Sequence, residues 1–152
     1  MNSLFAGRRS FNQSIEHWDV SSVTSMSRMF NDARKFNQTI NDWNVSMVTD
    51  MSYMFRSAWV FNQPLNSWNV SSVNNMSYMF NYAFGFNQPL DKWGEIVSSV
   101  TDMSHMFFDA RSFNQPLDNW DVSMVTNMSY MFAATESFNQ SLNDWDVSSV
   151  TD

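Results

Sequence analysis

Hydrophobic and polar positions follow one another along this chain in a pattern that returns about every 25 residues. In residues 51–58, apolar side chains lie at i, i+3, i+4 and i+7, which is the apolar face of a short helix. A Phe-Asn-Gln-Pro corner follows, and its proline cannot continue a helix. Trp68 and Val70 then alternate with a polar residue, as in a short half-buried strand. Each period therefore predicts one short helix and one short strand.

Six copies of this pattern account for the whole chain. Phe-Asn-Gln begins at Phe11, Phe36, Phe61, Phe86, Phe113 and Phe138. Division at the methionine that opens each Met-x-x-Met/Leu-Phe segment yields the units 1–25, 26–50, 51–75, 76–102, 103–127 and 128–152. Self-similarity at this period is typical of solenoids, and no linker separates the units. We predict one α/β domain: a right-handed, leucine-rich-repeat-like solenoid of six turns, with one strand and one helix per turn, forming a segment of a longer array.

Constant positions should form columns along the stack. The tryptophans at one such position should point inward and be buried, and they are Trp18, Trp43, Trp68, Trp93, Trp120 and Trp145. The Asn-Gln pairs at the corners form a polar column, which we interpret as an amide ladder that satisfies backbone groups. The fourth unit is longer because of Gly94, Glu95 and Ile96, where we expect a bulge or a widened corner.

The string Phe-Asn-Gln-Pro-Leu-x-x-Trp-x-Val-Ser-x-Val-x-x-Met-Ser-x-Met-Phe, seen in residues 61–80, resembles the BspA-like surface-protein repeats. These are leucine-rich-repeat relatives of bacterial and Mycoplasma surface proteins. The resemblance covers the whole chain. It implies a secreted or cell-surface protein used in adhesion, without catalysis and with no shared active site.

Composition and charge narrow the classes of function. Hydrophobic residues make up 43% of the chain and charged residues 15%, which is too apolar for a disordered protein. The net charge of -7 argues against binding of nucleic acid, which needs clustered Lys and Arg. There is no cysteine, so disulfides are excluded. The segment shows neither a signal peptide nor a membrane span, so an extracellular or cell-surface location rests on the resemblance.

Positions that differ between units are the candidates for binding, because the constant positions hold the fold. Bulky aromatic residues replace small or charged ones in the middle units at Trp59, Tyr82, Phe84 and Phe108. Arg, Lys and Glu stand at equivalent positions in the flanking units. An aromatic cluster rimmed by charge is typical of a binding patch. The alternative is that these side chains pack over the edge of the stack as local core.

A second aromatic column lies between the two methionines of each unit. It contains Tyr53, Tyr78, His105 and Tyr130. Such a ladder suits contact with a sugar or a protein, and it also stabilises a stack without any ligand. We include the three tyrosines among the candidate ligand-binding residues. We interpret His105 as a ladder member, since no acid or nucleophile recurs at a spacing that supports a general base.

The predicted strand surface is rich in oxygen-bearing side chains: Glu16, Asp19, Asp42, Asn44, Asn69, Asp91, Asp118, Asp121, Asp144 and Asp146. Calcium between turns would need such ligands, but no calcium-loop motif appears. We therefore interpret this surface as a solvated acidic face and predict no metal site.

No pattern of catalytic residues is present: there are two histidines without partners, no phosphate-binding loop and no zinc motif. We expect a non-catalytic scaffold without cofactor that recognises a protein or a glycan through its lateral surface. The alternative is a structural fibre or surface-layer segment that assembles end to end, because the last unit keeps an apolar stacking face.

Overall fold

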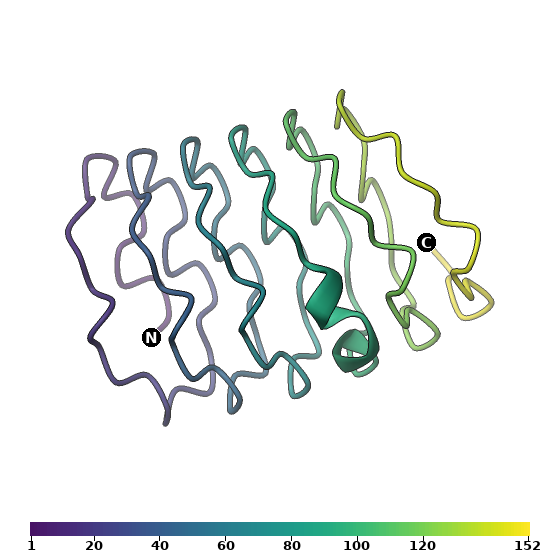
Figure 1. Ribbon diagram of the computed structural model, residues 1–152, viewed down its shortest axis with the longest axis horizontal. Helices are drawn as coiled ribbons and strands as arrows, with labels where there is room; N and C mark the ends of the chain where they lie inside the picture. The colour runs from purple at the N-terminus through teal and green to yellow at the C-terminus, as the bar shows by residue number, and fades with distance from the viewer.

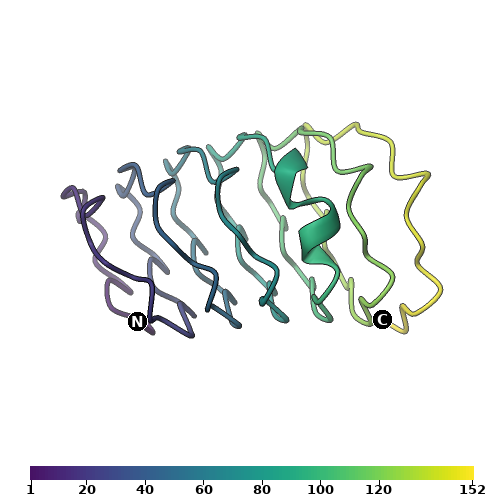
Figure 2. The same cartoon turned by 60° about the horizontal axis from the view of Figure 1, so that its bottom comes forward.

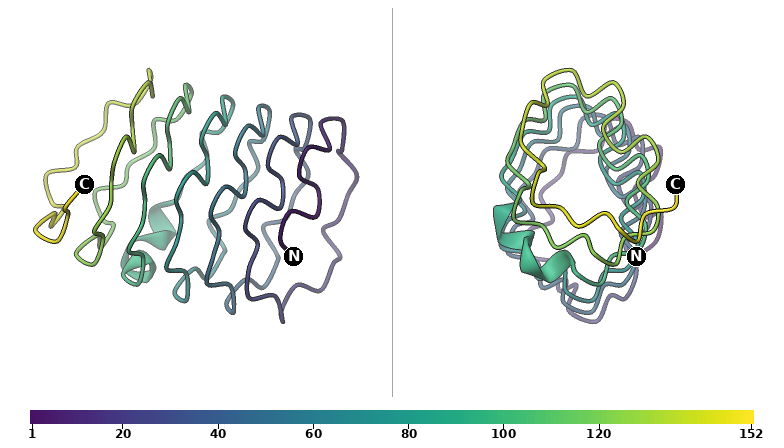
Figure 3. Two further views of the ribbon diagram at one scale, coloured as in Figure 1. Left: turned by 180° about the vertical axis from the view of Figure 1, so that it is seen from behind. Right: turned by 90° about the vertical axis from the view of Figure 1, so that its right-hand side faces the viewer.

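The computed structural model describes residues 1–152, apart from the side chain of Glu95. The chain winds into six coils that lie side by side along one axis, in the order of the sequence (Figure 1). A second view shows the same order (Figure 2). Seen along the axis, the coils lie nearly over one another around one shared interior (right panel of Figure 3). Each coil therefore packs mainly against its two neighbours, as in other repeat stacks.

The predicted strand and helix in each turn are absent. Among the described residues the only helices are two short 3₁₀ helices, η1 (Asp91–Trp93) and η2 (Glu95–Val97), both in the fourth coil. The described residues form no β-strand. Parallel pairing is reduced to isolated bridges that join one residue per coil: Ser25 to Asp50, Asp50 to Asn75, Asn75 to Asp102 and Asp102 to Asn127. The prediction of an α/β leucine-rich-repeat-like solenoid is therefore wrong, and the coils consist almost entirely of turns.

The Met-x-x-Met-Phe segment of each coil shows why no helix forms. In the second coil, the N–H of Arg28 donates to the carbonyl of Ser52 in the next coil at 2.9 Å. The N–H of Met29 donates only three residues back, to Met26, at 3.1 Å. Arg28 and Asp32 have left-handed φ values of 58° and 57°, as the third residue of a type II turn does. Donors that an α-helix would use internally therefore join neighbouring coils.

The Leu-x-x-Trp-x-Val-x-x-Val segment is also built from turns. In the third coil, the N–H of Trp68 donates to the carbonyl of Leu65 at 3.1 Å, and that of Val73 donates to Val70 at 2.9 Å. A strand cannot make such bonds, because its donors and acceptors point sideways to neighbouring strands. The apolar residues of this segment nevertheless face inward, and Trp68, Val70 and Val73 are buried.

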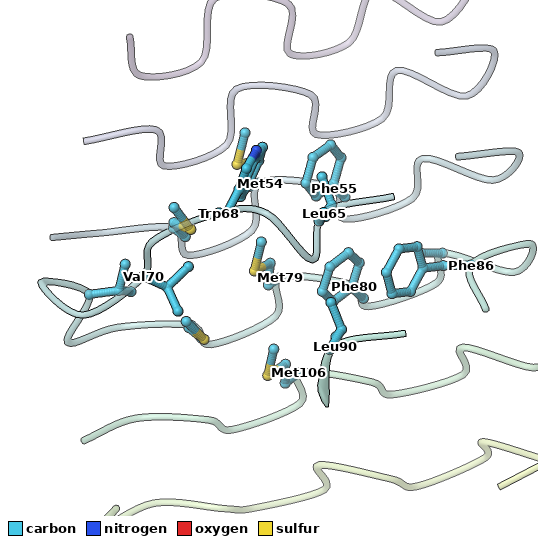
Figure 4. Close-up of a cluster of buried hydrophobic side chains, with 14 of the residues drawn as sticks. Met54, Phe55, Leu65, Trp68, Val70, Met79, Phe80, Phe86, Leu90 and Met106 are labelled. Carbon is cyan, nitrogen blue, oxygen red and sulfur yellow. The ribbon is translucent and has the colours of Figure 1, made fainter. Parts of the chain in front are cut away.

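Two columns of phenylalanine rings form the centre of the stack. Within the third coil, the rings of Phe55 and Phe61 stack with centroids 4.1 Å apart. Phe55 stacks on Phe80 of the next coil at 5.6 Å, and Phe61 stacks on Phe86 at 6.1 Å. The methionines form a further row beside them, in which Met79 lies between the equivalent residues of neighbouring coils (Figure 4). The apolar repeat positions thus bury one another across coils, which no single coil could do alone.

The predicted tryptophan column is confirmed. The four tryptophans of the inner coils are buried, and Trp18 and Trp145 of the end coils are partly buried. Each indole N–H after the first donates to a carbonyl of the preceding coil; that of Trp68, for example, donates to Ile40 at 2.9 Å. Because a buried indole N–H needs a partner, this bond ties one coil to the next.

The two extra residues of the fourth unit are taken up by η1 and η2, which stand out from the shared outline of the coils (Figure 3). A β-bulge was the wrong expectation, because no strand exists there to bulge. Gly94 joins the two helices, and its carbonyl accepts from the N–H of Asp121 at 3.0 Å. Asn119 packs on the same corner and donates from Nδ2 to the carbonyl of Asp91 at 2.7 Å.

Gly94→Ala should destabilise this corner. A Cβ at residue 94 would lie 2.5 Å from Nδ2 and 2.8 Å from the backbone oxygen of Asn119, so the fifth coil would have to shift. We expect a loss of about 1–3 kcal/mol in the free energy of unfolding, measured by chemical denaturation. Ser99→Ala, an exposed change in the same segment, is the control and should stay within about 0.5 kcal/mol. Equal stability of the two variants would contradict this packing.

Candidate binding surface

The Asn-Gln pairs at the corners serve the backbone, as predicted. Oδ1 of Asn62 accepts from the N–H of Asn87 and from Nε2 of Gln88, each at 3.0 Å. The same pair of bonds recurs at each of the other four junctions between coils. In the inner coils these side chains are partly exposed rather than fully buried. Since the asparagine Oδ1 at each junction already accepts two hydrogen bonds, the amide ladder joins the coils and holds the fold.

Part of the acidic surface also has a structural role. Oδ1 of Asp121 accepts from the N–H and the hydroxyl of Ser123, and Asp19 and Asp146 close the same kind of turn. Asn44 and Asn69 do so in the second and third coils. These are Asx turns, for which either residue type supplies the oxygen. Among the described residues, no group of three or more His, Cys, Asp or Glu residues is arranged to hold a metal ion.

These Asx turns should make the stack sensitive to acid. The hydroxyl and the N–H of the following serine lower the pKa of Asp19, Asp121 and Asp146 below the ordinary value of 3.8. A carboxylate with a lowered pKa stabilises the fold above its unfolded pKa, and that contribution is lost as the pH falls through the folded value. A variant with all three aspartates replaced by asparagine should match the wild type near pH 7. Its Tm should fall less between about pH 6 and about pH 3. Identical Tm curves would contradict this role.

The tyrosine column (Tyr53, Tyr78, His105 and Tyr130) forms a continuous stack. Tyr53 and Tyr78 have nearly parallel rings with centroids 4.5 Å apart, and Tyr78 stacks on His105 at 4.4 Å. Tyr130 lies 5.0 Å from His105 and is 66% exposed. The guanidinium of Arg28 lies 4.7 Å from the ring centroid of Tyr53 and extends the column by one coil. Burial, together with Tyr53 and Asp102, raises the pKa of Tyr78, so its ring is neutral at physiological pH.

The four residues of the predicted patch also come together. The ring of Phe84 lies 5.8 Å from that of Trp59 in the preceding coil and 6.1 Å from that of Tyr82 in its own coil. Tyr82 packs edge-on against Phe108 at 5.5 Å. Trp59 is 38% exposed, and the other three rings are partly exposed. The rings pack against one another, as local core at the edge of the stack would do. They also present area to solvent, as a binding patch would do.

His105 joins the two groups of rings. Its imidazole lies 5.7 Å from the ring of Phe108 and also stacks within the tyrosine column. Together, the tyrosine column and the four patch residues form one surface, which we call the aromatic surface. Nδ1 of His105 is buried and has no hydrogen-bond partner among the described residues. The sequence pattern identified the separate groups, whereas the link through His105 depends on how the turns fold.

Arginines frame the aromatic surface. The guanidinium of Arg34 lies over Trp59 at 4.0 Å from the ring centroid, and that of Arg111 lies over Phe84 at 4.8 Å. Nε of Arg34 pairs with Oδ1 of Asp32 at 2.6 Å. Although burial opposes it, hydrogen bonds from Arg34 and Arg9 lower the pKa of Asp32, so this carboxylate stays charged. Cation–π contacts of this kind hold both partners in place.

The fold and this surface define a repeat protein of stacked, turn-built coils with an aromatic lateral face. A family model described as Mycoplasma protein of unknown function, DUF285, matches residues 1–96 and again residues 86–152. The chain therefore belongs to this family. The match is consistent with a surface-protein repeat family and does not itself identify the BspA-like repeats. No curated protein and no solved structure matches the chain. Among the described residues, no helix is long and apolar enough to cross a membrane.

Proposed function

We propose that this chain is a non-catalytic recognition module of a cell-surface or secreted repeat protein, and that it binds a protein or a glycan through the aromatic surface. The observation that carries the proposal is the continuous contact of the rings from Tyr53 to Trp59, by way of His105 and Phe108. This run of rings spans three consecutive coils at the middle of the stack, and Tyr130 extends it to the last coil.

Physical reasons favour binding at this surface over other faces. The rings are already held by stacking and by arginine contacts, so a ligand would immobilise few side chains. Aromatic rings also offer large contact area at a low cost in conformational entropy. The constant columns are occupied by the core and by the amide ladder, so they leave little that could distinguish one ligand from another. The resemblance to surface-protein repeats supports the same class of function.

A glycan and surface-protein array probed with this chain tests the proposal. The variant Trp59→Ser, Tyr82→Ser, Phe84→Ser, Phe108→Ser should lose the binding that the wild type shows, while its circular dichroism spectrum stays the same. The control is Met47→Ser with Met124→Ser, which removes exposed apolar side chains outside the aromatic surface and should leave binding unchanged. Full affinity of a folded quadruple variant would rule out the patch of Trp59, Tyr82, Phe84 and Phe108 as the ligand contact.

A structural role by end-to-end stacking is the second candidate. The last coil has an apolar depression of about 340 Å³, whose lining includes Phe132, Leu142, Trp145 and Val147. Such a face can pack on another apolar coil, and repeated head-to-tail contacts yield open filaments. Light scattering across a concentration series should then show growing particles. A particle of constant monomeric size would leave recognition as the sole candidate.

A further inference from the structure

A groove lies at the edge of the aromatic surface, where Trp59 meets the two preceding coils. Its walls are Arg9, Ser10, Arg34, Lys35, Trp59 and Val60, and its volume is about 370 Å³. Trp59 and Val60 are both exposed, at 38% and 49%. Because the walls combine an indole, a branched aliphatic side chain and the methylene stems of long side chains, the groove offers mainly apolar surface with cationic groups at its margin.

The charge of the groove is opposite to that of the protein. The chain carries 15 Asp and Glu against 8 Lys and Arg, yet three of those eight basic residues line this one groove. Asp32 is paired with two of them: Nε of Arg9 lies 2.8 Å from Oδ2 of Asp32, and Nε of Arg34 lies 2.6 Å from Oδ1. Among the described residues these are the only hydrogen bonds to the two guanidiniums, and a guanidinium has further donors. The groove therefore favours a negatively charged ligand.

Part of the backbone of this edge is already paired between coils. The N–H of Lys35 donates to the carbonyl of Arg9 at 3.1 Å, and the N–H of Gly85 donates to the carbonyl of Trp59 at 3.0 Å. These groups cannot pair with a ligand strand, and recognition through the groove rests on the side chains that line it. A sugar ring needs donors and acceptors around its rim, and the groove supplies one hydroxyl, that of Ser10, beside the cations. An apolar side chain flanked by carboxylates matches the walls better.

We propose that this groove binds an acidic polypeptide segment, with one apolar side chain seated against Trp59 and Val60 and with flanking carboxylates paired with Lys35 and the arginines. This inference rests on the proposed function and specifies its ligand as protein. The ion pairs with Asp32 fix the positions of the arginines before the ligand arrives. The ligand therefore meets a formed site rather than flexible chains.

The test uses labelled peptides and fluorescence anisotropy with the full chain. The peptide Glu-Glu-Leu-Phe-Glu-Glu should bind, and its binding should weaken as salt rises from about 0.05 M to about 0.5 M, because salt screens exposed charges. Lys-Lys-Leu-Phe-Lys-Lys and Glu-Glu-Ser-Ser-Glu-Glu, which lack the charge or the apolar side chains, should bind at least about fivefold more weakly. Equal binding of either control peptide, or of a heparin oligosaccharide, would overturn the proposal.

A matched pair of charge reversals locates the site. Lys35→Glu should weaken binding of the Glu-Glu-Leu-Phe-Glu-Glu peptide by about fivefold or more, while Lys92→Glu, the same change at the other lysine, should leave it unchanged. Val60→Ser should weaken it without changing the salt dependence. Equal effects of the two lysine changes would overturn the site. Absence of peptide binding, with an array ligand still lost in the quadruple serine variant, would overturn the groove and leave the proposed function standing.

Discussion

Replacing Trp68 with alanine is expected to lower the free energy of unfolding by about 3–5 kcal/mol, as other large-to-small core changes do. Trp68 is 1% exposed, and its ring lies 6.4 Å from that of Phe55. The substitution removes the hydrogen bond to the carbonyl of Ile40 and leaves a cavity in the middle of the stack. Chemical denaturation followed by circular dichroism measures the loss.

Trp59→Ala is the control for this prediction. It removes the same side chain from an exposed position, where it contacts Arg34 and Phe84 but no core column. We expect a loss of about 1 kcal/mol or less, as is usual for a partly exposed residue. A larger loss from Trp59→Ala than from Trp68→Ala would contradict the assignment of the inner and outer faces.

The second large effect is expected from the amide ladder. Asn62→Leu keeps the size of the side chain but removes the acceptor for the N–H of Asn87 and for Nε2 of Gln88. A buried or half-buried donor left without a partner costs about 1–3 kcal/mol, and two donors lose their partner here. We therefore expect a loss of about 2–4 kcal/mol in the free energy of unfolding.

Asn62→Asp separates the hydrogen bonds from other effects of the substitution. Aspartate supplies the same acceptor oxygen, so the N–H of Asn87 and Nε2 of Gln88 keep their partner. At neutral pH this variant should remain within about 1 kcal/mol of the wild type. If Asn62→Asp were as unstable as Asn62→Leu, the ladder would act through something other than these two bonds.

The columns of the stack could be predicted from the sequence because stacking makes equivalent residues neighbours whatever the path of the coil. The inward position of Trp68 and the role of Asn62 follow from repetition and from the need to satisfy polar groups. Neither inference requires a strand or a helix. For that reason both hold although the predicted secondary structure is wrong.

The predicted helix is wrong because a backbone path built from turns gives the same spacing of apolar residues as a helix does. In each Met-x-x-Met-Phe segment, left-handed residues four apart, such as Arg28 and Asp32, turn the chain back so that positions i, i+3, i+4 and i+7 face the core. Alternate N–H groups that a helix would bond internally donate to the next coil, and those between them donate three residues back within the turns. One local signal was present, since none of the positions with positive φ carries a β-branched residue.

The members of the aromatic surface were visible as departures from the repeat, but their connections were not. Arg34 lies over Trp59, and His105 touches both Tyr78 and Phe108. These contacts depend on the lateral shift between coils and on the turn at each left-handed residue. A pattern of residue types carries no information on such shifts. The groove beside Trp59 therefore emerges from the three-dimensional arrangement alone.

The central claim is that the chain binds its ligand through the aromatic surface. Hydroxyl-radical footprinting tests it most directly, with the chain measured free and in complex with the ligand that the array identifies. Binding through the aromatic surface predicts that oxidation of Trp59 and Phe84 falls in the complex. Oxidation of Met47 and Met124, which are 56% and 57% exposed and lie outside that surface, should stay the same. Unchanged oxidation of Trp59 and Phe84, with protection of the two methionines instead, would contradict the account.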